Sequence, residues 1–262
     1  MDLNLKDKVI LITGGAKGIG FGIAQTVANE GAIAVIIGRK EVDNKNAIDL
    51  IMKNGGKAFG IEAELTSPEC CEKAVQRTIT EFGRIDGLVN NAGLNDGVGL
   101  ENGNYEGFLQ SLHRNLIHYY LMAHHALPEL IKSKGSIVNI SSKTGETGQG
   151  NTSAYAASNG GRNALTREWA VELLKYGIRV NALVVAECWT PQYQNWIKTL
   201  NNPQETLNKI TANIPLENRM TTTQEIGNAV AFLLSNKSSH TTGQIIYVDG
   251  GYVHLDRALV NA

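Results

Sequence analysis

Short runs of apolar residues alternate with longer, helix-like stretches along the whole chain. The apolar runs lie at 9–12, 34–37, 58–61, 87–89, 136–140, 178–185 and 245–248. Continuous apolar runs of this length are typical of strands that are covered on both faces. The pattern therefore predicts about seven buried strands.

The stretches between these runs are long enough for crossover helices. Helices are predicted at 19–30, 40–54, 68–82, 105–132, 153–175 and 223–234. Strands that alternate with helices indicate a parallel sheet with helices on both faces and a ligand site at the carboxyl ends of the strands. The predicted fold is α/β: a single Rossmann-type, doubly wound parallel sheet.

We find no internal repeat, no linker and no shift in composition, so residues 1–262 are expected to form a single dinucleotide-binding and catalytic domain. Residues 187–216 follow the sixth predicted strand and look irregular. An insertion at the strand ends is placed to cover a substrate, so we predict a substrate loop or lid there.

Charge and composition narrow the class of protein. With 24 basic and 25 acidic side chains, the formal net charge is −1, which does not fit a dedicated nucleic-acid binder. The 28 glycines exceed ordinary usage and indicate tight turns and close backbone approaches. The chain is thus expected to act on a small molecule, without a nucleic-acid partner.

The cysteines and the apolar runs bear on the compartment. Cys70, Cys71 and Cys188 form no paired framework and lack metal-ligand spacing, which favours a reducing cytoplasm. The chain start has no signal-peptide core, and no run reaches the ~18 apolar residues of a membrane span. The six histidines form no ligand cluster either. We expect a cytoplasmic protein with neither a membrane span nor a metal site.

The first predicted strand leads directly into a glycine-rich turn that opens a helix. Glycines there let a pyrophosphate approach the main chain, and the helix start favours negative charge. This context, at the head of a βαβ unit, predicts a dinucleotide site, with a purely structural turn as the alternative. The predicted cofactor-binding residues of the turn are Gly14, Lys17, Gly18, Ile19 and Gly20.

The end of the second strand bears on the choice of cofactor. NAD sites place a carboxylate there for the ribose 2′-hydroxyl, whereas this chain has Gly38 followed by Arg39. Arg39 could hold a 2′-phosphate through charge-assisted hydrogen bonds, with Lys17 as a second cation. The sequence therefore favours NADP over NAD; the alternative is that both cations are simply solvated.

Several motifs resemble the short-chain dehydrogenase/reductase family, and they occur in the family's order along nearly the whole chain. They are Thr13-Gly14-(x)3-Gly18-Ile19-Gly20, Asn90-Asn91-Ala92-Gly93, Asn139-Ile140-Ser141-Ser142, Tyr155, Arg179-Val180-Asn181-Ala182 and Val248-Asp249-Gly250-Gly251. The resemblance implies an NAD(P)-dependent oxidoreductase and a homotetramer.

The resemblance also assigns roles to individual residues. Tyr155 would be the acid/base, Ser142, thirteen residues before it, would hold the substrate oxygen, and Asn115 would anchor a water in the proton relay. Cofactor contacts beyond the glycine turn and Arg39 are implied at Glu64, Leu65, Asn91, Gly93, Tyr155, Asn159 and Thr190. The alternatives are that Tyr155 only packs in the core and that the Asn115 amide only forms hydrogen bonds within its helix.

The chain departs from the family pattern at the active-site lysine. The family's Tyr-(x)3-Lys ends here in Asn159. A phenol is a poor base at neutral pH unless its anion is stabilised nearby, and an amide carries no charge to do so. From the sequence alone we expect cofactor binding with low turnover, and Asn159 as a neutral ribose ligand.

A narrower resemblance points to sugars. The segments 186–191, 220–222, 239–243 and 251–257 resemble the sugar-oxidising branch, in particular the L-fucose dehydrogenases, which oxidise the anomeric hydroxyl of an aldose to a lactone. Besides Ser142 and Tyr155, the predicted substrate residues are Glu187, Trp189, Tyr193 and Trp196, because sugar sites combine aromatic faces with polar groups. Ordinary loop packing of these four is the alternative. The competing function is a catalytically weak cofactor-binding protein that acts as a sensor or scaffold.

Overall fold

A computed structural model describes residues 2–256. Seven strands form one sheet in the order β3-β2-β1-β4-β5-β6-β7, and every pair of neighbours is parallel. The strands are β1 (Val9–Thr13), β2 (Ile33–Gly38), β3 (Lys57–Glu62), β4 (Gly87–Asn90), β5 (Ser136–Ser142), β6 (Arg179–Val185) and β7 (Ile245–Val248). The predicted doubly wound fold is confirmed.

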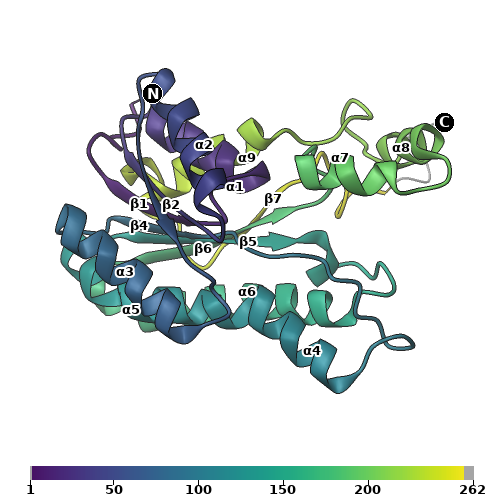
Figure 1. The fold of residues 1–262 in the computed structure, drawn as a ribbon, viewed down its shortest axis with the longest axis horizontal. Coiled ribbons are helices and arrows are strands. Elements are labelled where there is room, and N and C mark those ends of the chain that lie inside the picture. Colours follow the sequence, from purple (N-terminus) through teal and green to yellow (C-terminus); the bar gives the residue numbers. More distant parts are fainter. Residues whose placement is uncertain (1, 257–262) are drawn as a thin grey trace.

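Helices cover both faces of this sheet, as Figure 1 shows: α1, α2 and α9 lie on one side, and α3, α4, α5 and α6 on the other. Their bounds are α1 (Gly18–Asn29), α2 (Glu41–Lys53), α3 (Pro68–Phe82), α4 (Tyr105–Leu112), α5 (His118–Ser133), α6 (Ser153–Glu172), α7 (Pro191–Lys198), α8 (Pro203–Ala212) and α9 (Thr223–Leu234). Short helical turns are η1 (His113–Ile117), η2 (Lys143–Gly145), η3 (Leu174–Tyr176) and η4 (Asn236–Ser238).

Two apolar cores follow from the alternation of side chains along each strand. In β1, Ile10 and Ile12 belong to the core beneath α1 and α9, whereas Val9 and Leu11 belong to the core beneath α3 and α5. All four side chains are buried. Because both faces are covered, the strands read as continuous apolar runs.

Two segments differ from the predicted elements. The helix expected at 105–132 is interrupted at η1, a π-helical turn, which places Asn115 in an irregular part of the helix. The segment 187–216 is not irregular, because it contains α7 and α8. Thr190 caps α7 by accepting a hydrogen bond from the amide of Tyr193, and proline starts both helices. Its role as a lid stays a prediction.

The topology brings the predicted site residues to one edge of the sheet. The carboxyl ends of β1, β4, β5 and β6 carry the glycine turn, Asn91, Ser142 and Glu187, and Ser142 pairs with Val185 in register. In Figure 1, α7 and α8 lie beyond the ends of β5 and β6. Within residues 2–256, no helix has the length and apolar character that crossing a membrane requires.

Candidate active site

The glycine turn between β1 and α1 is built so that only glycine fits its key positions. Gly14 has φ +65°, in the left-handed region. A Cβ at Gly20 would lie 2.2 Å from the carbonyl oxygen of Gly14. Lys17 precedes α1 and makes no side-chain cap, so the first amides of the helix are left for a ligand. This cradle fits the pyrophosphate of a dinucleotide.

The turn is fixed to neighbouring strand ends. The hydroxyl of Thr13 accepts from the amides of Asn91 (2.8 Å) and Ala92 (3.0 Å), and Asn91 Nδ2 donates to the Thr13 carbonyl at 2.8 Å. Thr190 lies against the other side, because a Cβ at Gly18 would meet its side chain at 3.4 Å. The structure thus brings Gly14, Gly18, Asn91 and Thr190 together, as their predicted shared role requires.

The two cations predicted to select NADP lie beside carboxylates. Lys17 Nζ pairs with Asp43 Oδ2 at 2.7 Å, and Arg39 Nη1 lies 3.9 Å from Glu64 Oε2. Arg39 is 72% exposed at its side chain, so this loose pair holds it only weakly. Asp43, in the first turn of α2, was not predicted from the sequence. Leu65 is buried.

These residues fit a nicotinamide dinucleotide: the glycine turn would hold its pyrophosphate, and the ends of β2 and β3 its adenosine. Bound there, it would supply a hydride acceptor or donor. Side chains of this chain would then bind and orient the substrate and transfer its proton.

Of the two serines that end β5, Ser142 is the one available to a substrate. Ser141 is buried and donates to the carbonyl oxygen of Asn159 at 3.3 Å. Ser142 is half-buried, and its oxygen accepts from the amide of Thr144. The turn η2, which follows it, packs closely on α6, since a Cβ at Gly145 would lie 3.0 Å from the backbone of Asn159.

Tyr155 lies on the first turn of α6 and is half-buried. It is not among the residues of either apolar core, and its ring centre lies 5.8 Å from Cζ of Arg162. Its acid/base role stays a prediction.

Asn115 is fully buried in η1 and held on every side. Its Oδ1 accepts from the amide of Leu94 at 2.7 Å, and its Nδ2 donates to the carbonyl of Ser111 at 3.0 Å. Its own carbonyl oxygen accepts from Arg162 Nε at 2.7 Å. The predicted anchor for a relay water is thus bound to a guanidinium in this structure.

Asn159 is also fully buried, and protein groups satisfy its side chain. Its Nδ2 donates to the Tyr155 carbonyl (2.8 Å) and to Thr144 Oγ1 (3.3 Å), while its Oδ1 accepts from Arg162 Nη1 at 2.9 Å. Its predicted contact with a cofactor ribose stays a prediction. Arg162 was not predicted, although it lies three residues after Asn159 on the same helix face.

Burial sets the charge state of the aromatic and imidazole groups next to Arg162. Burial, and then the nearby positive charge of Arg162, lower the pKa of His118 to about 3, so that its ring is neutral. His118 Nε2 lies 3.0 Å from the Arg114 carbonyl. Burial likewise raises the pKa of Tyr119 above its ordinary value. Both groups are uncharged at neutral pH.

The predicted sugar residues form a cluster around a buried ion pair. Glu187 pairs with Lys143, and each side chain is only 12% exposed. The ring centroid of Tyr193 lies 6.2 Å from that of Trp189 and 5.1 Å from that of Trp196. Burial, followed by the adjacent Glu187 carboxylate, raises the pKa of Tyr193 above its ordinary value. The structure therefore brings all four predicted residues together.

Lys143 is a member of this cluster that the sequence analysis missed. It follows Ser142 directly, and its Nζ lies 4.1 Å from the centre of the Tyr252 ring. Its position directly after Ser142, a predicted catalytic residue, could have indicated from the sequence that Lys143 belongs to the site. Half-exposed tryptophans and a buried charged pair together offer an apolar face and polar donors and acceptors, which suits a polyol.

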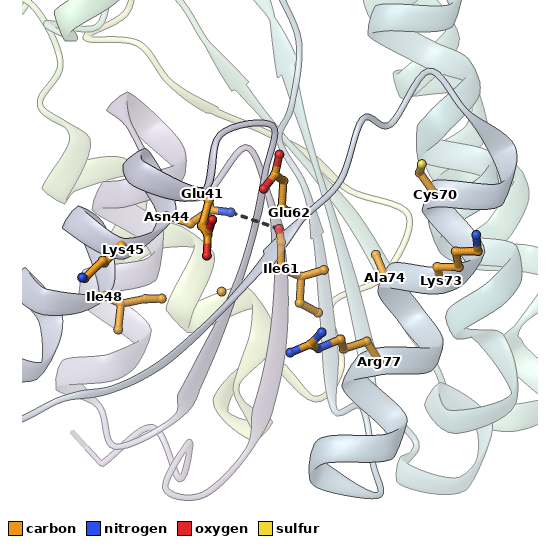
Figure 2. Close-up of a pocket in the computed structure, with 11 residues that line it drawn as sticks. Glu41, Asn44, Lys45, Ile48, Ile61, Glu62, Cys70, Lys73, Ala74 and Arg77 are labelled. Atoms are coloured by element: carbon orange, nitrogen blue, oxygen red, sulfur yellow. Dashed lines mark hydrogen bonds between the residues drawn. The ribbon is translucent and has the colours of Figure 1, made fainter.

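A separate hollow of about 540 Å³ lies at the outer edge of the sheet, between α2, β3 and α3 (Figure 2). Asn44 spans its wall by donating to the Ile61 carbonyl at 3.1 Å. This pocket is on the edge strand and holds none of the predicted site residues. Within residues 2–256, no group of three histidine, cysteine or acidic side chains could hold a metal ion, and all three cysteines are free.

Comparisons with known proteins identify the family of this chain. Residues 14–253 match the family described as "Enoyl-(Acyl carrier protein) reductase". The L-fucose dehydrogenase of Rattus norvegicus is 34% identical over 245 residues, which cover 93% of this chain and 88% of that protein. The chain belongs to the short-chain dehydrogenase/reductase family and is an oxidoreductase.

Three solved structures are similar over nearly their whole length. Cj0485 dehydrogenase is 48% identical, with a TM-score of 0.93 and coverage of 99% of each chain. The aldohexose dehydrogenase of Thermoplasma acidophilum is 28% identical (TM-score 0.88, 98% of each chain). An actinorhodin polyketide ketoreductase with NADPH is 27% identical (TM-score 0.89; 95% of this chain and 98% of that one). The family resemblance and the nicotinamide cofactor class are confirmed.

Proposed function

We propose that the protein oxidises the anomeric hydroxyl of an aldose, L-fucose or a close relative, to a lactone. The observation that carries the proposal is the cluster of Lys143, Glu187 and Tyr193 beside Ser142, with Trp189 and Trp196 at its rim. Charged and hydroxyl groups can each bind a sugar hydroxyl, and an indole can cover a sugar face. The similarity to L-fucose and aldohexose dehydrogenases supports the same substrate class.

In this proposal Ser142 donates a hydrogen bond to the substrate oxygen, and Tyr155 takes the hydroxyl proton. A nicotinamide cofactor held by the glycine turn would supply the acceptor for the hydride of the anomeric carbon, and loss of this hydride together with the hydroxyl proton would leave the carbonyl of the lactone. Glu187 and Lys143 orient the sugar.

For the cofactor we propose NADP, held by Arg39 with help from Lys17. NAD is the alternative, favoured by Asp43 and Glu64, whose carboxylates lie beside these cations. Titration of both cofactors tests the choice. We expect tighter binding of NADP and a reversed preference in Arg39→Asp; equal affinities in the parent protein would overturn it.

We also propose a cytoplasmic homotetramer. Apolar side chains along α4, η1 and α5 are exposed in the single chain: Tyr105, Phe108, Leu109, Ile117 and Tyr120. Such a set indicates a surface that pairs with another subunit. Light scattering of the purified protein would give four times the chain mass.

A panel of aldoses with both oxidised cofactors tests the substrate class. The expected result is cofactor reduction with L-fucose-like sugars. Cofactor binding without oxidation of any sugar would favour the alternative, a sensor or scaffold, and turnover of an acyl substrate alone would contradict the proposal.

A further inference from the structure

The guanidinium of Arg162 is a buried cation beside the proposed acid/base. The residue is 3% exposed, and the oxygens to which it donates are all uncharged. They are the carbonyl of Asn115 (2.7 Å), the carbonyl of Ile140 (3.2 Å) and Oδ1 of Asn159 (2.9 Å). Its Nη2 has no hydrogen-bond partner among residues 2–256.

No carboxylate of the described residues neutralises this charge. None of their ion pairs includes Arg162. Charged and titratable groups on the segments around this part of α6 include His118, Tyr119, Arg114, Asp96, Lys143 and Glu146. The first two are uncharged at neutral pH. Arg114 lies 3.8 Å from Asp96, Lys143 pairs with Glu187, and Glu146 accepts from Asn163.

Aromatic rings lie against the guanidinium. Its Cζ is 4.4 Å from the centre of the Tyr119 ring and 5.8 Å from the centre of the Tyr155 ring. Gly93 closes another side, because a Cβ there would lie 2.8 Å from Nη2. A positive charge in such a poorly hydrated place acts strongly on a phenol that must lose its proton.

We propose that Arg162 is a positioning residue for proton transfer at Tyr155. Its charge favours the phenolate form of Tyr155, and its three hydrogen bonds hold Asn115, Ile140 and Asn159 around it. The chain therefore has a positive charge at its acid/base although residue 159 is an amide. With this charge in place we expect ordinary turnover, whereas the sequence alone predicts low turnover. Its link to catalysis rests on the proposed function, but the effect on the phenol does not.

A titration of the cofactor-free protein tests the effect on the Tyr155 phenol separately from catalysis. The ultraviolet absorbance of tyrosinate is followed against pH in the parent and in Arg162→Met, and subtracting the curve of Tyr155→Phe made in the same background isolates Tyr155, because Arg162 also acts on Tyr119. A unit charge ~6–8 Å away at an effective dielectric near 20 changes the phenolate population roughly 30- to 100-fold. We expect the Tyr155 signal to appear at higher pH in Arg162→Met by about 1.5 to 2 units.

Matched variants keep the test decisive. Arg162→Lys keeps the charge and should keep the parent's curve, as should Arg167→Met, which removes an exposed cation from the same helix. Should Arg162→Met fail to fold, Asn159→Lys/Arg162→Met moves the cation to position 159 and should restore the parent's signal. A Tyr155 signal that is the same in Arg162→Met and the parent, or missing from a folded double variant, would overturn the proposal.

Activity gives an independent second readout. With an aldose that the parent protein oxidises, Arg162→Met should lower kcat roughly 30- to 100-fold near neutral pH, with KM little changed. It should also shift the rising limb of the pH–rate profile to higher pH. A fall in kcat at every pH without that shift would show a merely structural role. Failure of every sugar in the panel would contradict the proposed function and leave the tyrosinate result standing.

Discussion

Arg162 Nη1 donates a hydrogen bond of 2.9 Å to Oδ1 of Asn159, and both side chains are buried. The amide is thus the acceptor that a guanidinium at this place needs. A lysine at position 159 would offer no acceptor and would place a second buried cation beside the first.

Asn159→Lys should therefore destabilise the protein and not activate it. Two buried like charges without a carboxylate partner should lower the free energy of unfolding on the order of 3 kcal/mol. Urea denaturation of the parent and the variant measures this difference. Removal of the guanidinium as well, in Asn159→Lys/Arg162→Met, should recover most of the loss. A single variant as stable as the parent and at least tenfold faster would contradict this account and support the interpretation from the sequence alone.

Tyr155→Phe removes the proposed proton acceptor and little else. Tyr155 is half-buried, and the change removes only one oxygen, so the fold should tolerate it. We expect kcat to fall roughly 1000-fold, in line with the loss of general acid–base catalysis, while cofactor affinity stays within about twofold. Steady-state kinetics and fluorescence titration of the cofactor check the two halves. Retained turnover would show that the proton is transferred elsewhere.

Glu187→Gln should weaken both substrate binding and the fold. The change leaves Lys143, 12% exposed, without its counter-ion, and costs about 1–3 kcal/mol of unfolding free energy. We expect KM for the sugar to rise roughly tenfold. Glu205→Gln is the matched control, because its pair with Lys209 is exposed on α8 and should contribute less than ~1 kcal/mol. Equal effects of the two substitutions would argue against a special role for Glu187.

His118 should make the protein less stable in mild acid. Its pKa is about 3 in the folded protein and near the ordinary 6.5 when unfolded, so between these values the unfolded chain binds one more proton. Its contribution to stability is complete above pH 6.5 and is lost as the pH falls towards 3. The free energy of unfolding should fall by about 1.4 kcal/mol per pH unit in that window. His118→Gln should flatten this slope; an unchanged slope would mean that other groups cause it.

The sequence predicted the sheet well because its central strands β1, β2, β4, β5 and β6 are almost entirely buried and leave a clear apolar signal. It also predicted the glycine turn, since Gly14 and Gly20 are required by backbone geometry alone. Two short helices after β6 were missed because their polar composition resembles a loop, although Thr190-Pro191 carries a capping signal.

The parts of the site that escaped prediction depend on tertiary contacts. Arg162 reads as an ordinary helix cation until Asn115 and Ile140, far away in sequence, are seen to accept its hydrogen bonds. Lys143 gains its meaning only from Glu187, which the pairing of β5 with β6 brings near. Asp43 is likewise significant only beside Lys17.

The most direct test of the central claim is the product formed from L-fucose in the presence of oxidised cofactor, compared with the same sugar lacking its anomeric hydroxyl. We expect one lactone formed for each cofactor reduced, and no reduction with the 1-deoxy sugar. Cofactor reduction with the 1-deoxy sugar, or a ketone product in place of the lactone, would contradict it.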